Sequence, residues 1–436
     1  MSGDFTVEAM RCAERWQAQA AELAALPPKP VRSPQEAARA ERKLAEGWAE
    51  RERFLGMHAP ALYRALTGDL TQFVRIEQLV EDAALRVPGL VPTRAEIAAE
   101  SARLQAEKDG HEIAQGLLLA HVLADAACGR HLCHAMQLPR PEAKALLPRL
   151  LQDRAVDLPT ARVSRQGNAT VVTTRNPRFL NAEDEATLDD FEIAVDLATL
   201  DPLTTACVLR GDAVTHPRYA GRRVFSAGIN LTHLYHGRIS FLWYLRRDLG
   251  AVNKMFRGLA EPGSPPDEWR GTTQEKPWIA AVEAFAIGGG CQILLACDYV
   301  LAARGAFMTL PARKEGIIPG AANLRLPRFT GDRIARQAIA YGRRLDCDSP
   351  DGRLICDEIA DGAEMDAALA NVIDGLTNSG AVSFAANRRA LRVGAEPLDI
   401  FRMYMAVYAR EQAYCHFSPA LIANLERHWR AQERTA

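Results

Sequence analysis

Apolar residues recur at helical spacing through the first third of the chain. Between residues 62 and 80 they stand three or four positions apart, as on one face of a helix: Leu62, Leu66, Leu70, Phe73, Ile76 and Val80. Two capping boxes, Ser33-Pro34-Gln35-Glu36 and Thr93-Arg94-Ala95-Glu96, predict helix starts. A long apolar stretch predicts a further helix over 112–136. We therefore expect the first third to be helical throughout.

The pattern changes near residue 158, after a run of prolines. The following stretch predicts strands that alternate with helices: a hairpin over 161–165 and 169–174, helices over 181–200, 242–259 and from 291, and strands over 204–210 and 278–285. Such alternation is typical of βαβ units and of the α/β class. We expect an α-helical N-terminal domain over 1–158, an α/β catalytic core over 159–360, and a C-terminal helical segment over 361–436 for oligomerisation or pocket closure.

Composition narrows the class of protein. With 48% hydrophobic and 25% charged residues, the 436-residue chain can bury enough surface to fold. Lys and Arg number 53 against 54 Asp and Glu, so the net charge of −1 gives no reason to expect a nucleic-acid or membrane partner. The most apolar window, 280–303, contains Glu283, Gln292 and Asp298, which argues against a membrane span. Nine scattered cysteines without a CxxC pair, and no targeting segment, predict a cytoplasmic enzyme.

Two glycine-containing turns carry the candidate chemistry. The first runs over 224–231 and the second over 286–292, each between a predicted strand and a helix. Neither fits the dinucleotide fingerprint or the P-loop, because no Lys-Ser/Thr follows the glycines. Glycine permits close approach of backbone to a ligand, so free N–H groups of both turns can converge on one oxygen atom. The alternative is that the glycines only allow close helix–strand packing.

Several sequence blocks, in order, resemble the crotonase (enoyl-CoA hydratase/isomerase) superfamily. They are Arg175-Asn176-Pro177, Leu180-Asn181-Ala182, Phe225-Ser226-Ala227-Gly228, Ile287-Gly288-Gly289-Gly290-Cys291, Cys297-Asp298, Leu310-Pro311, Gly316-Ile317-Ile318-Pro319-Gly320 and Arg325-Leu326-Pro327-Arg328. The resemblance implies a crotonase-like core, a ββα spiral, that binds acyl-CoA thioesters. It implies that the backbone N–H groups of Ile229 and Gly289 hold the thioester carbonyl. Other turn residues are then expected to contact the substrate: Val224, Phe225, Ala227, Gly228, Asn230, Gly288 and Gly290.

Two departures from the hydratase pattern redirect the predicted reaction. Hydratases have a glutamate at each of two positions that are occupied here by Gln292 and Ala312, neither of which can act as a general base. Over nearly its whole length, the chain resembles the 3,5-dihydroxyphenylacetyl-CoA 1,2-dioxygenases of glycopeptide-antibiotic biosynthesis. That resemblance implies an arylacetyl-CoA and O2 as substrates, CoA release without metal, flavin or haem, and trimers that pair as hexamers.

Four charged side chains are candidates for the substrate contacts of such a dioxygenase. The segment 241–247 offers apolar side chains for O2 and a cation for a peroxide, for which Arg247 is favoured over Arg246. Glu183 is the candidate partner of the ring hydroxyls, and Gln292 a hydrogen-bonding group. Arg222 and Arg223 precede the first turn, where CoA contacts are expected. Each has a simpler interpretation, either a solvated arginine or a helix-start carboxylate.

Two rival functions remain open at this stage. One is a crotonase-type hydratase, isomerase or thioesterase that uses a base such as Glu183, Glu315 or a histidine. The other is a non-catalytic acyl-CoA-binding protein. His131-x-Cys133-His134 lacks a second ligand pair, so we expect no metal site there. The sequence does not single out the group that removes the α-proton of the substrate.

Overall fold

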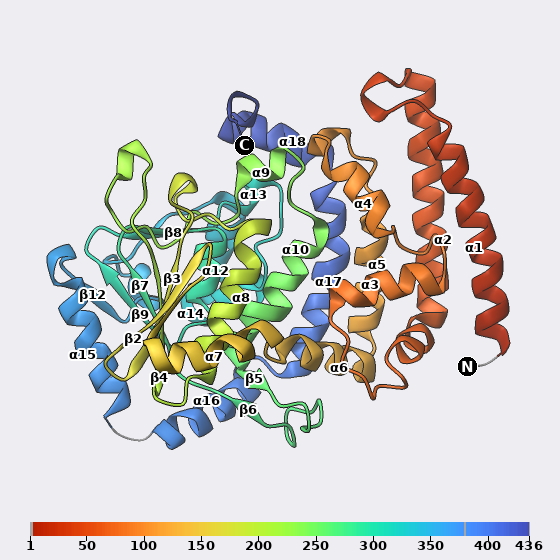
Figure 1. Cartoon of the computed structure of the whole chain (residues 1–436). Coiled ribbons are helices and arrows are strands. Elements are labelled where there is room, and N and C mark those ends of the chain that lie inside the picture. Colours follow the sequence, from red (N-terminus) through yellow and green to blue (C-terminus); the bar gives the residue numbers. More distant parts are fainter. Residues whose placement is uncertain (1–2, 379–380, 436) are drawn as a thin grey trace.

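Helices follow one another from residue 3 to residue 153 in the computed structural model, which describes residues 3–378 and 381–435 (Figure 1). They are α1 (Gly3–Ala24), α2 (Pro34–Leu66), α3 (Ile76–Arg86), α4 (Arg94–Ser101), α5 (Ile113–Ala124), α6 (Ala126–Gln137) and α7 (Pro141–Asp153). Both predicted capping boxes are confirmed, because the Ser33 and Thr93 side chains accept the N–H groups of Glu36 and Glu96.

Two of the predicted N-terminal helices are each divided in the structure. The apolar face over 62–80 is interrupted between α2 and α3, where Gly68, Asp69 and Leu70 all have positive φ. The predicted helix over 112–136 is likewise two helices, because the Asp125 side chain caps α6 by accepting the N–H groups of its first turn. In both cases the apolar spacing continues across the break, so periodicity alone does not reveal it.

A mixed seven-stranded sheet forms the other half of the molecule. Its strands lie in the order β1 (Ala155–Asp157), β2 (Ala161–Gln166), β3 (Ala169–Thr174), β4 (Ala206–Gly211), β7 (Trp278–Val282), β9 (Tyr299–Ala303) and β12 (Glu358–Ala360). The first three are antiparallel, as the predicted hairpin requires, and each later strand is parallel to its neighbour.

Successive residues of the central strands serve two separate cores. Val172 and Leu209 belong to a core that α8 (Glu185–Leu200) covers, whereas Val171 and Val208 face a second core under α15 (Met365–Thr377). This division follows from the alternation of side chains along a strand. The strand predicted over 278–285 is corrected to two, since β7 ends at Val282 and β8 starts at Phe285.

A small sheet and several helices complete the structure. The order of the small sheet is β11 (Leu345–Asp346), β10 (Phe307–Thr309) and β8 (Phe285–Ile287), and β5 (Leu259–Ala260) pairs with β6 (Thr273–Gln274). The remaining helices are α9 (Leu231–Tyr235), α10 (Phe241–Arg246), α11 (Asn253–Arg257), α12 (Gly289–Leu294), α13 (Ala312–Glu315), α14 (Ala322–Tyr341), α16 (Ala381–Ala395), α17 (Leu398–His416) and α18 (Pro419–Asn424).

The helix predicted over 242–259 is wrong as a single element. It consists of α10, a π-helical segment (Arg247–Val252) and α11, with non-helical angles at Gly250. A Cβ at Gly250 would lie 2.9 Å from the Glu192 carboxylate of α8, so glycine permits this close approach. The wider turn brings Arg247 and Asp248 into the interior, where both are buried. π-Helical turns of this kind often occur at functional sites.

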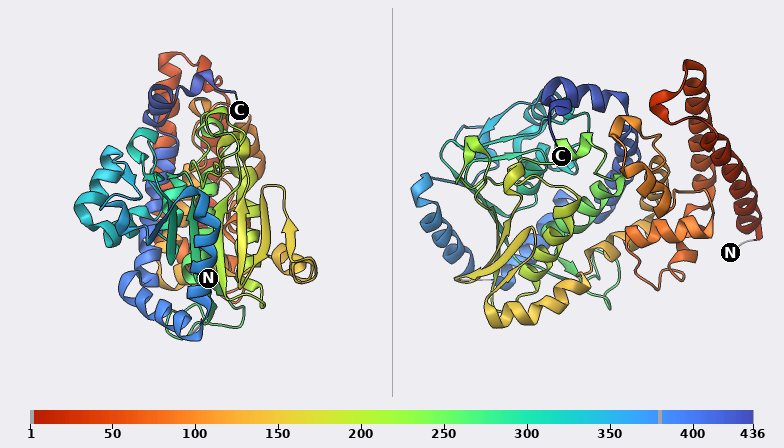
Figure 2. Two further views of the ribbon diagram at one scale, coloured as in Figure 1. Left: turned by 90° about the vertical axis from the view of Figure 1, so that its left-hand side faces the viewer. Right: turned by 45° about the horizontal axis from the view of Figure 1, so that its top comes forward.

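Helix α17 joins the two halves of the molecule. Figures 1 and 2 show this C-terminal helix running beside the N-terminal helices, between them and the sheet. Gly116 of α5 allows the approach, because a Cβ there would lie 2.8 Å from the Ala409 carbonyl oxygen of α17. Residues from α5, α10 and α17 share one apolar core. The N-terminal helices therefore pack directly against segments that line the site described below.

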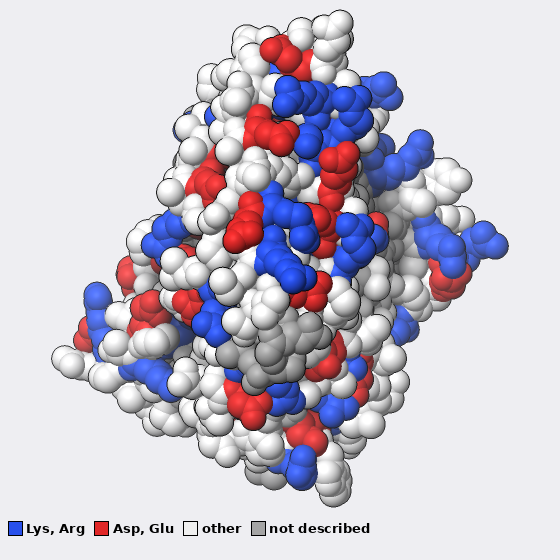
Figure 3. Space-filling model, turned by 90° about the vertical axis from the view of Figure 1, so that its right-hand side faces the viewer, with Lys and Arg blue, Asp and Glu red and all other residues white. Residues whose placement is uncertain are grey.

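Positive and negative side chains are interspersed on the face of the molecule that the N-terminal helices form (Figure 3). This distribution accords with the net charge of −1. No helix in the described ranges combines the length and the apolar character needed to cross a bilayer.

A buried carboxylate fixes the C-terminal helices to the rest of the fold. Glu396, between α16 and α17, is fully buried and accepts two hydrogen bonds of 2.9 Å from Arg325 of α14 and one from Arg328. Arg257 of α11 contacts the same carboxylate at 3.3 Å. Although burial opposes the charge, these arginines lower the pKa of Glu396 from 4.5 to about 2.

Replacing Glu396 with glutamine is expected to lower the free energy of unfolding by about 3 kcal/mol at neutral pH. Because the folded-state pKa lies below the unfolded value, the stabilisation is present above pH 4.5 and is lost as the pH falls towards about 2. The difference from wild type, measured by denaturant unfolding, therefore shrinks over that range. Glu364→Gln, at an exposed position, is the control. Equal losses in the two variants would contradict the assignment.

Candidate active site

The two glycine turns lie against each other. The first turn precedes α9 and the second connects β8 to α12. Ile287 N–H donates to the Ser226 carbonyl at 3.0 Å, which joins the turns backbone to backbone. A Cβ at Gly228 would lie 2.7 Å from the Ile287 carbonyl oxygen and 3.0 Å from the Gly289 nitrogen. The φ angle of Gly228 is +79°, so both conformation and space require glycine there.

Two backbone N–H groups of these turns have no protein acceptor in the ranges that the structure describes. Gly288 donates to Thr309, and Asn230 donates to Glu183, each at 2.8 Å. The neighbouring donors, Ile229 N–H and Gly289 N–H, make no hydrogen bond to another described protein group. Buried backbone donors are nearly always paired, so two adjacent free ones can bind an oxygen atom that carries negative charge. The resemblance to the crotonase superfamily implies this pair, and both residues line one cavity.

A buried arginine organises the polar side chains next to the turns. Arg247, which is 2% exposed, donates to Glu183 at 2.5 Å and to the Gly289 carbonyl at 2.9 Å. It also donates to Asp248 and to Gln292, each at 2.9 Å. Burial opposes its charge, yet Glu183 and Asp248 together raise the pKa of Arg247. Burial also raises the pKa of the Asp248 carboxyl, although Arg247 stabilises its ionised form. The guanidinium is therefore permanently charged.

Arg246, the alternative cation, lies outside this group. Its guanidinium contacts Glu77 at 3.0 Å, Glu185 at 3.3 Å and Asp189 at 2.5 Å. The first of these carboxylates lies on α3 and the other two on α8. Two cavities lie beside the glycine turns: one contains Arg247 and is described below, and the other, of about 30 Å³, is lined by Glu183, Phe225 and Trp243 among others. Arg246 lines neither. The structure thus places Arg247, not Arg246, among the candidate residues.

A small cavity of about 20 Å³ is lined by the residues of the two free donors and by three aromatic side chains, Trp243, Tyr244 and Tyr408. Its lining combines the predicted residues with side chains from distant elements: Ile229, Trp243, Tyr244, Arg247, Asp248, Gly289, Gln292, Glu315, Ile317, Ile318, Gly320 and Tyr408. This volume holds one small molecule such as water, so a bound aryl group requires the surrounding side chains to move. Sequence reasoning missed Asp248 and Tyr408. Asp248 directly follows Arg247, whereas Tyr408 lies on α17, and no pattern in the chain connects it to the site.

The remaining predicted residues position the first turn or lie outside the cavity. The Val224 carbonyl accepts a hydrogen bond from Asn181 at 2.8 Å, and Ala227 N–H donates to Leu180 at 3.2 Å. Phe225 is buried in the sheet core and lines the cavity that also contains Glu183 and Trp243. A Cβ at Gly290 would lie 2.8 Å from that of Ser226, and Gly288 has a φ of +52°. These residues support the two turns, and none of them lines the cavity that contains Ile229 and Gly289.

Asn230 and a nearby histidine fix the first turn to α8. The Asn230 side chain donates to Asp184 at 2.9 Å and accepts the His233 N–H at 3.2 Å. His233 lies 3.0 Å from the same Asp184 carboxylate. Despite its burial, the hydrogen bonds from His233 and Asn230 lower the pKa of Asp184. Asp184 caps α8 directly after Glu183, so this network holds Glu183 beside Gly289.

Arg222 and Arg223, the predicted CoA contacts, are on the surface. Arg222 is exposed and stacks over Tyr219 at 5.8 Å, and Arg223 lies 3.8 Å from Glu283. Neither lines a cavity beside the glycine turns. They are accessible to a ligand that reaches the site from solvent.

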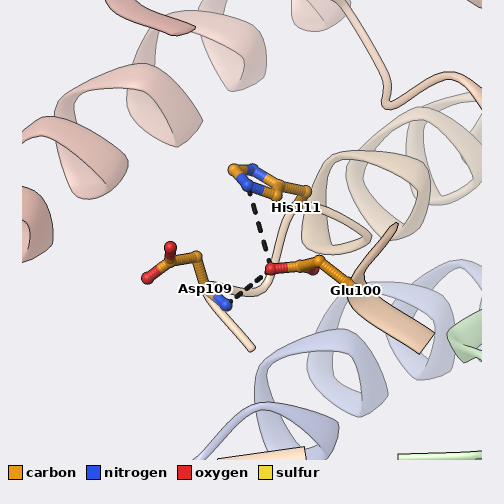
Figure 4. A group of neighbouring side chains, drawn as sticks. All are labelled: Glu100, Asp109 and His111. Atoms are coloured by element: carbon orange, nitrogen blue, oxygen red, sulfur yellow. Dashed lines mark hydrogen bonds and ion pairs between the residues drawn. The ribbon is translucent and has the colours of Figure 1, made fainter. Parts of the chain in front are cut away.

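His131 and His134, considered above as metal ligands, lie in the helical half. His131 contacts the Tyr63 hydroxyl at 2.8 Å, and His134 contacts the Glu261 carbonyl at 3.2 Å. In the described residues, the one group with metal-ligand spacing is Glu100, Asp109 and His111 (Figure 4). The Asp109 carboxylate is held by both Arg32 nitrogens at 2.6 and 2.8 Å, which neutralises it. A cavity of about 490 Å³ adjoins this group, and neither glycine turn reaches it.

The chain is similar in sequence to known proteins over most of its length. A sequence profile of the enoyl-CoA hydratase/isomerase family matches residues 265–406. The chain is 46% identical over 392 residues to a (3,5-dihydroxyphenyl)acetyl-CoA 1,2-dioxygenase of Amycolatopsis orientalis, covering 90% of this chain and 89% of that protein. It is 26% identical to a short-chain-enoyl-CoA hydratase of Clostridium acetobutylicum, covering 54% and 81%. A solved enoyl-CoA hydratase from Mycobacterium avium subsp. paratuberculosis K-10 gives a TM-score of 0.49 at 21% identity, covering 63% and 97%.

Proposed function

The chain belongs to the (3,5-dihydroxyphenyl)acetyl-CoA 1,2-dioxygenase family, within the enoyl-CoA hydratase/isomerase superfamily, and we propose that it catalyses the same reaction. It converts 3,5-dihydroxyphenylacetyl-CoA and O2 to 3,5-dihydroxyphenylglyoxylate and CoA, without a metal or organic cofactor. The observation that carries the proposal is the pair of free donors, Ile229 N–H and Gly289 N–H, in a chain that has lost the hydratase glutamates at Gln292 and Ala312.

The reaction begins with a thioester enolate. The carbon between the thioester and the electron-rich ring loses a proton, and its electron pair moves to the carbonyl oxygen, which the two N–H groups stabilise. One such donor is worth roughly 2.7–4 kcal/mol of transition-state stabilisation. Because the enolate is conjugated with the ring, it can transfer one electron to O2 directly. Recombination of the two radicals then forms a peroxide at the α-carbon.

The peroxide completes the reaction without a further reactant. Its terminal oxygen attacks the thioester carbonyl and expels CoA as the thiolate. Cleavage of the O–O bond, with loss of the remaining α-proton, leaves a ketone at the α-carbon and a carboxylate. Both atoms of O2 are thus incorporated, the α-carbon is oxidised and O2 is reduced.

Arg247 and Glu183 are the side chains that we assign to substrate and peroxide. Arg247 lines the cavity beside Gly289, so it is placed to stabilise the developing peroxide anion. Glu183 lies against the same glycine and is the proposed hydrogen-bond partner of a ring hydroxyl. Since the two are joined by a 2.5 Å ion pair, they act together. The Gln292 side-chain oxygen accepts one hydrogen bond from Arg247, and we assign its amide N–H groups as hydrogen-bond donors to the substrate.

We also propose a trimer or a dimer of trimers, with C-terminal helices at the subunit contacts. An apolar stripe of Ile400, Met403 and Val407 runs along α17 at helical spacing, with exposed fractions of 51%, 45% and 59%. An exposed apolar stripe of this kind is typical of an interface. As in its family, the product is proposed to serve glycopeptide-antibiotic biosynthesis.

An oxygen electrode separates the candidate functions. Metal-chelated protein with 3,5-dihydroxyphenylacetyl-CoA is expected to consume one O2 for each CoA released. Release of CoA without O2 consumption would instead indicate a thioesterase, and addition of water to an enoyl-CoA would indicate a hydratase. Binding without turnover would indicate an acyl-CoA-binding protein. Loss of O2 uptake after chelation would contradict the metal-independent mechanism.

A further inference from the structure

Glu315 brings an unpaired carboxylate into the cavity of the two free donors. It is the last residue of α13, is 8% exposed, and lines the same cavity as Ile229 and Gly289. Its two carboxylate oxygens lie 3.6 and 3.9 Å from the position that a Cβ would take on Gly288. The carboxylate therefore lies beside the residue that directly precedes one of the two donors.

Unlike the two carboxylates that surround Arg247, Glu315 has no hydrogen-bond or ion-pair partner in the described part of the chain. Glu183 and Asp248 are both held by Arg247, whereas no hydrogen bond or ion pair reaches Glu315. No hydrogen bond or ion pair joins Glu315 to any described titratable or charged side chain of α13 or the surrounding elements, which are Arg313, Lys314, Tyr244, Arg247, Asp248, Arg325, Tyr408, His416, Glu426, Arg427 and His428. A buried carboxylate without partners is unfavourable for stability, so its position favours a functional role.

We propose that Glu315 is the catalytic base that removes the α-proton of the bound thioester. One carboxylate oxygen accepts the proton, and the C–H electron pair moves to the carbonyl oxygen held by Ile229 and Gly289. The α-carbon is bonded to the carbonyl carbon, so it must lie close to these donors and to the adjacent carboxylate. This inference rests on the proposed enolate mechanism.

The position of Glu315 explains how the chain can dispense with the hydratase glutamates. Ala312 occupies one of those positions, at the start of α13, and Glu315 follows it three residues later on the same short helix. Residues three apart on a helix share a face, so Glu315 presents its carboxylate on the face that Ala312 occupies. Glu183 is less suitable as the base, because accepting a proton would break its ion pair with Arg247.

The ionisation of Glu315 suits proton transfer near neutral pH. Burial alone raises its pKa from 4.5 to about 7. A base acts in its ionised form, so proton removal is expected to increase as the pH rises through about 7 and to level off above it. In wild type the acid limb of kcat/KM should report this group.

The test follows α-proton exchange in the absence of O2. Protein and 3,5-dihydroxyphenylacetyl-CoA in D2O under argon are analysed by mass spectrometry for deuterium at the α-carbon. Glu315→Gln is expected to exchange at least 100-fold more slowly than wild type, with unchanged thioester affinity and circular dichroism. Glu315→Asp is expected to retain part of the exchange. Glu112→Gln is the matched control, because Glu112 is also buried with a pKa raised to about 7 but binds Phe241 N–H.

The outcomes distinguish this assignment from the proposed function. Exchange by wild type without O2 consumption in air would contradict the dioxygenase and leave Glu315 as the base of another enolate-forming enzyme. Equal exchange rates in Glu315→Gln and wild type, or no exchange in wild type, would overturn the assignment. An acid limb that persists near pH 7 in Glu315→Gln would also overturn it.

Discussion

Replacing Gly289 with alanine is expected to reduce O2 consumption by more than 100-fold. A Cβ at this position would collide with Glu183 Oε1 and would lie 3.1 Å from Arg247 Nη2. Since Glu183 is fixed by Arg247 and by the network around Asp184, it cannot move without disturbing the arginine. The backbone would shift instead and would move Gly289 N–H away from the carbonyl oxygen. Loss of one such donor typically costs a factor of 100 to 1000 in kcat.

The measurement compares kcat for O2 uptake with affinity for the substrate thioester. Gly375→Ala is the matched control, because Gly375 lies within α15 and a Cβ there meets no atom within 4 Å. It is expected to leave the kinetics unchanged and to stabilise the helix slightly. If Gly289→Ala retained the wild-type kcat, Gly289 N–H would not bind the developing negative charge.

Much of the fold follows from the sequence because its determinants are local. The capping boxes at Ser33 and Thr93 and the hairpin at Gly167 each depend on a few adjacent residues. Apolar periodicity predicted the helical N-terminal region, alternating strands and helices predicted the α/β core, and the resemblance implied its crotonase-like form; all three are confirmed. The helix over 242–259 was mispredicted because its break at Gly250 depends on contact with Glu192, which lies on another helix.

The candidate site shows the same division between local and distant determinants. Its glycine turns were recognised because glycine is required there by positive φ and by close backbone approach. Arg247 and Glu183 were selected separately, and only the structure shows that they form one ion pair across 64 residues. Tyr408 was missed because α17 reaches the cavity through packing on α5 and α10, which no local pattern encodes. The unpaired state of Glu315 likewise depends on residues that are distant in the chain.

Replacing Arg247 with alanine is expected to impair oxygenation far more than thioester binding. The arginine bonds to Glu183, Asp248, Gln292 and the Gly289 carbonyl, so its removal leaves the partly buried Glu183 and the buried Asp248 without a cation. Breaking a buried ion pair in this way typically costs about 3–5 kcal/mol of stability. O2 uptake is expected to fall more than 100-fold, because the peroxide loses its cation and Gly289 loses its support. Affinity for the CoA portion should change only a few-fold.

Arg246→Ala is the control for the general effect of removing an arginine from this part of the chain, because Arg246 directly precedes Arg247. Arg246 makes three ion pairs with partly exposed carboxylates, none of which lines the cavity. It should retain most of the oxygenase activity, since exposed pairs contribute little. Arg247→Lys keeps the charge but can satisfy fewer of the four partners, so its activity should fall between wild type and alanine. A parallel loss of binding and oxygenation in Arg247→Ala, with folding intact, would show that Arg247 serves substrate binding and not the oxygen step.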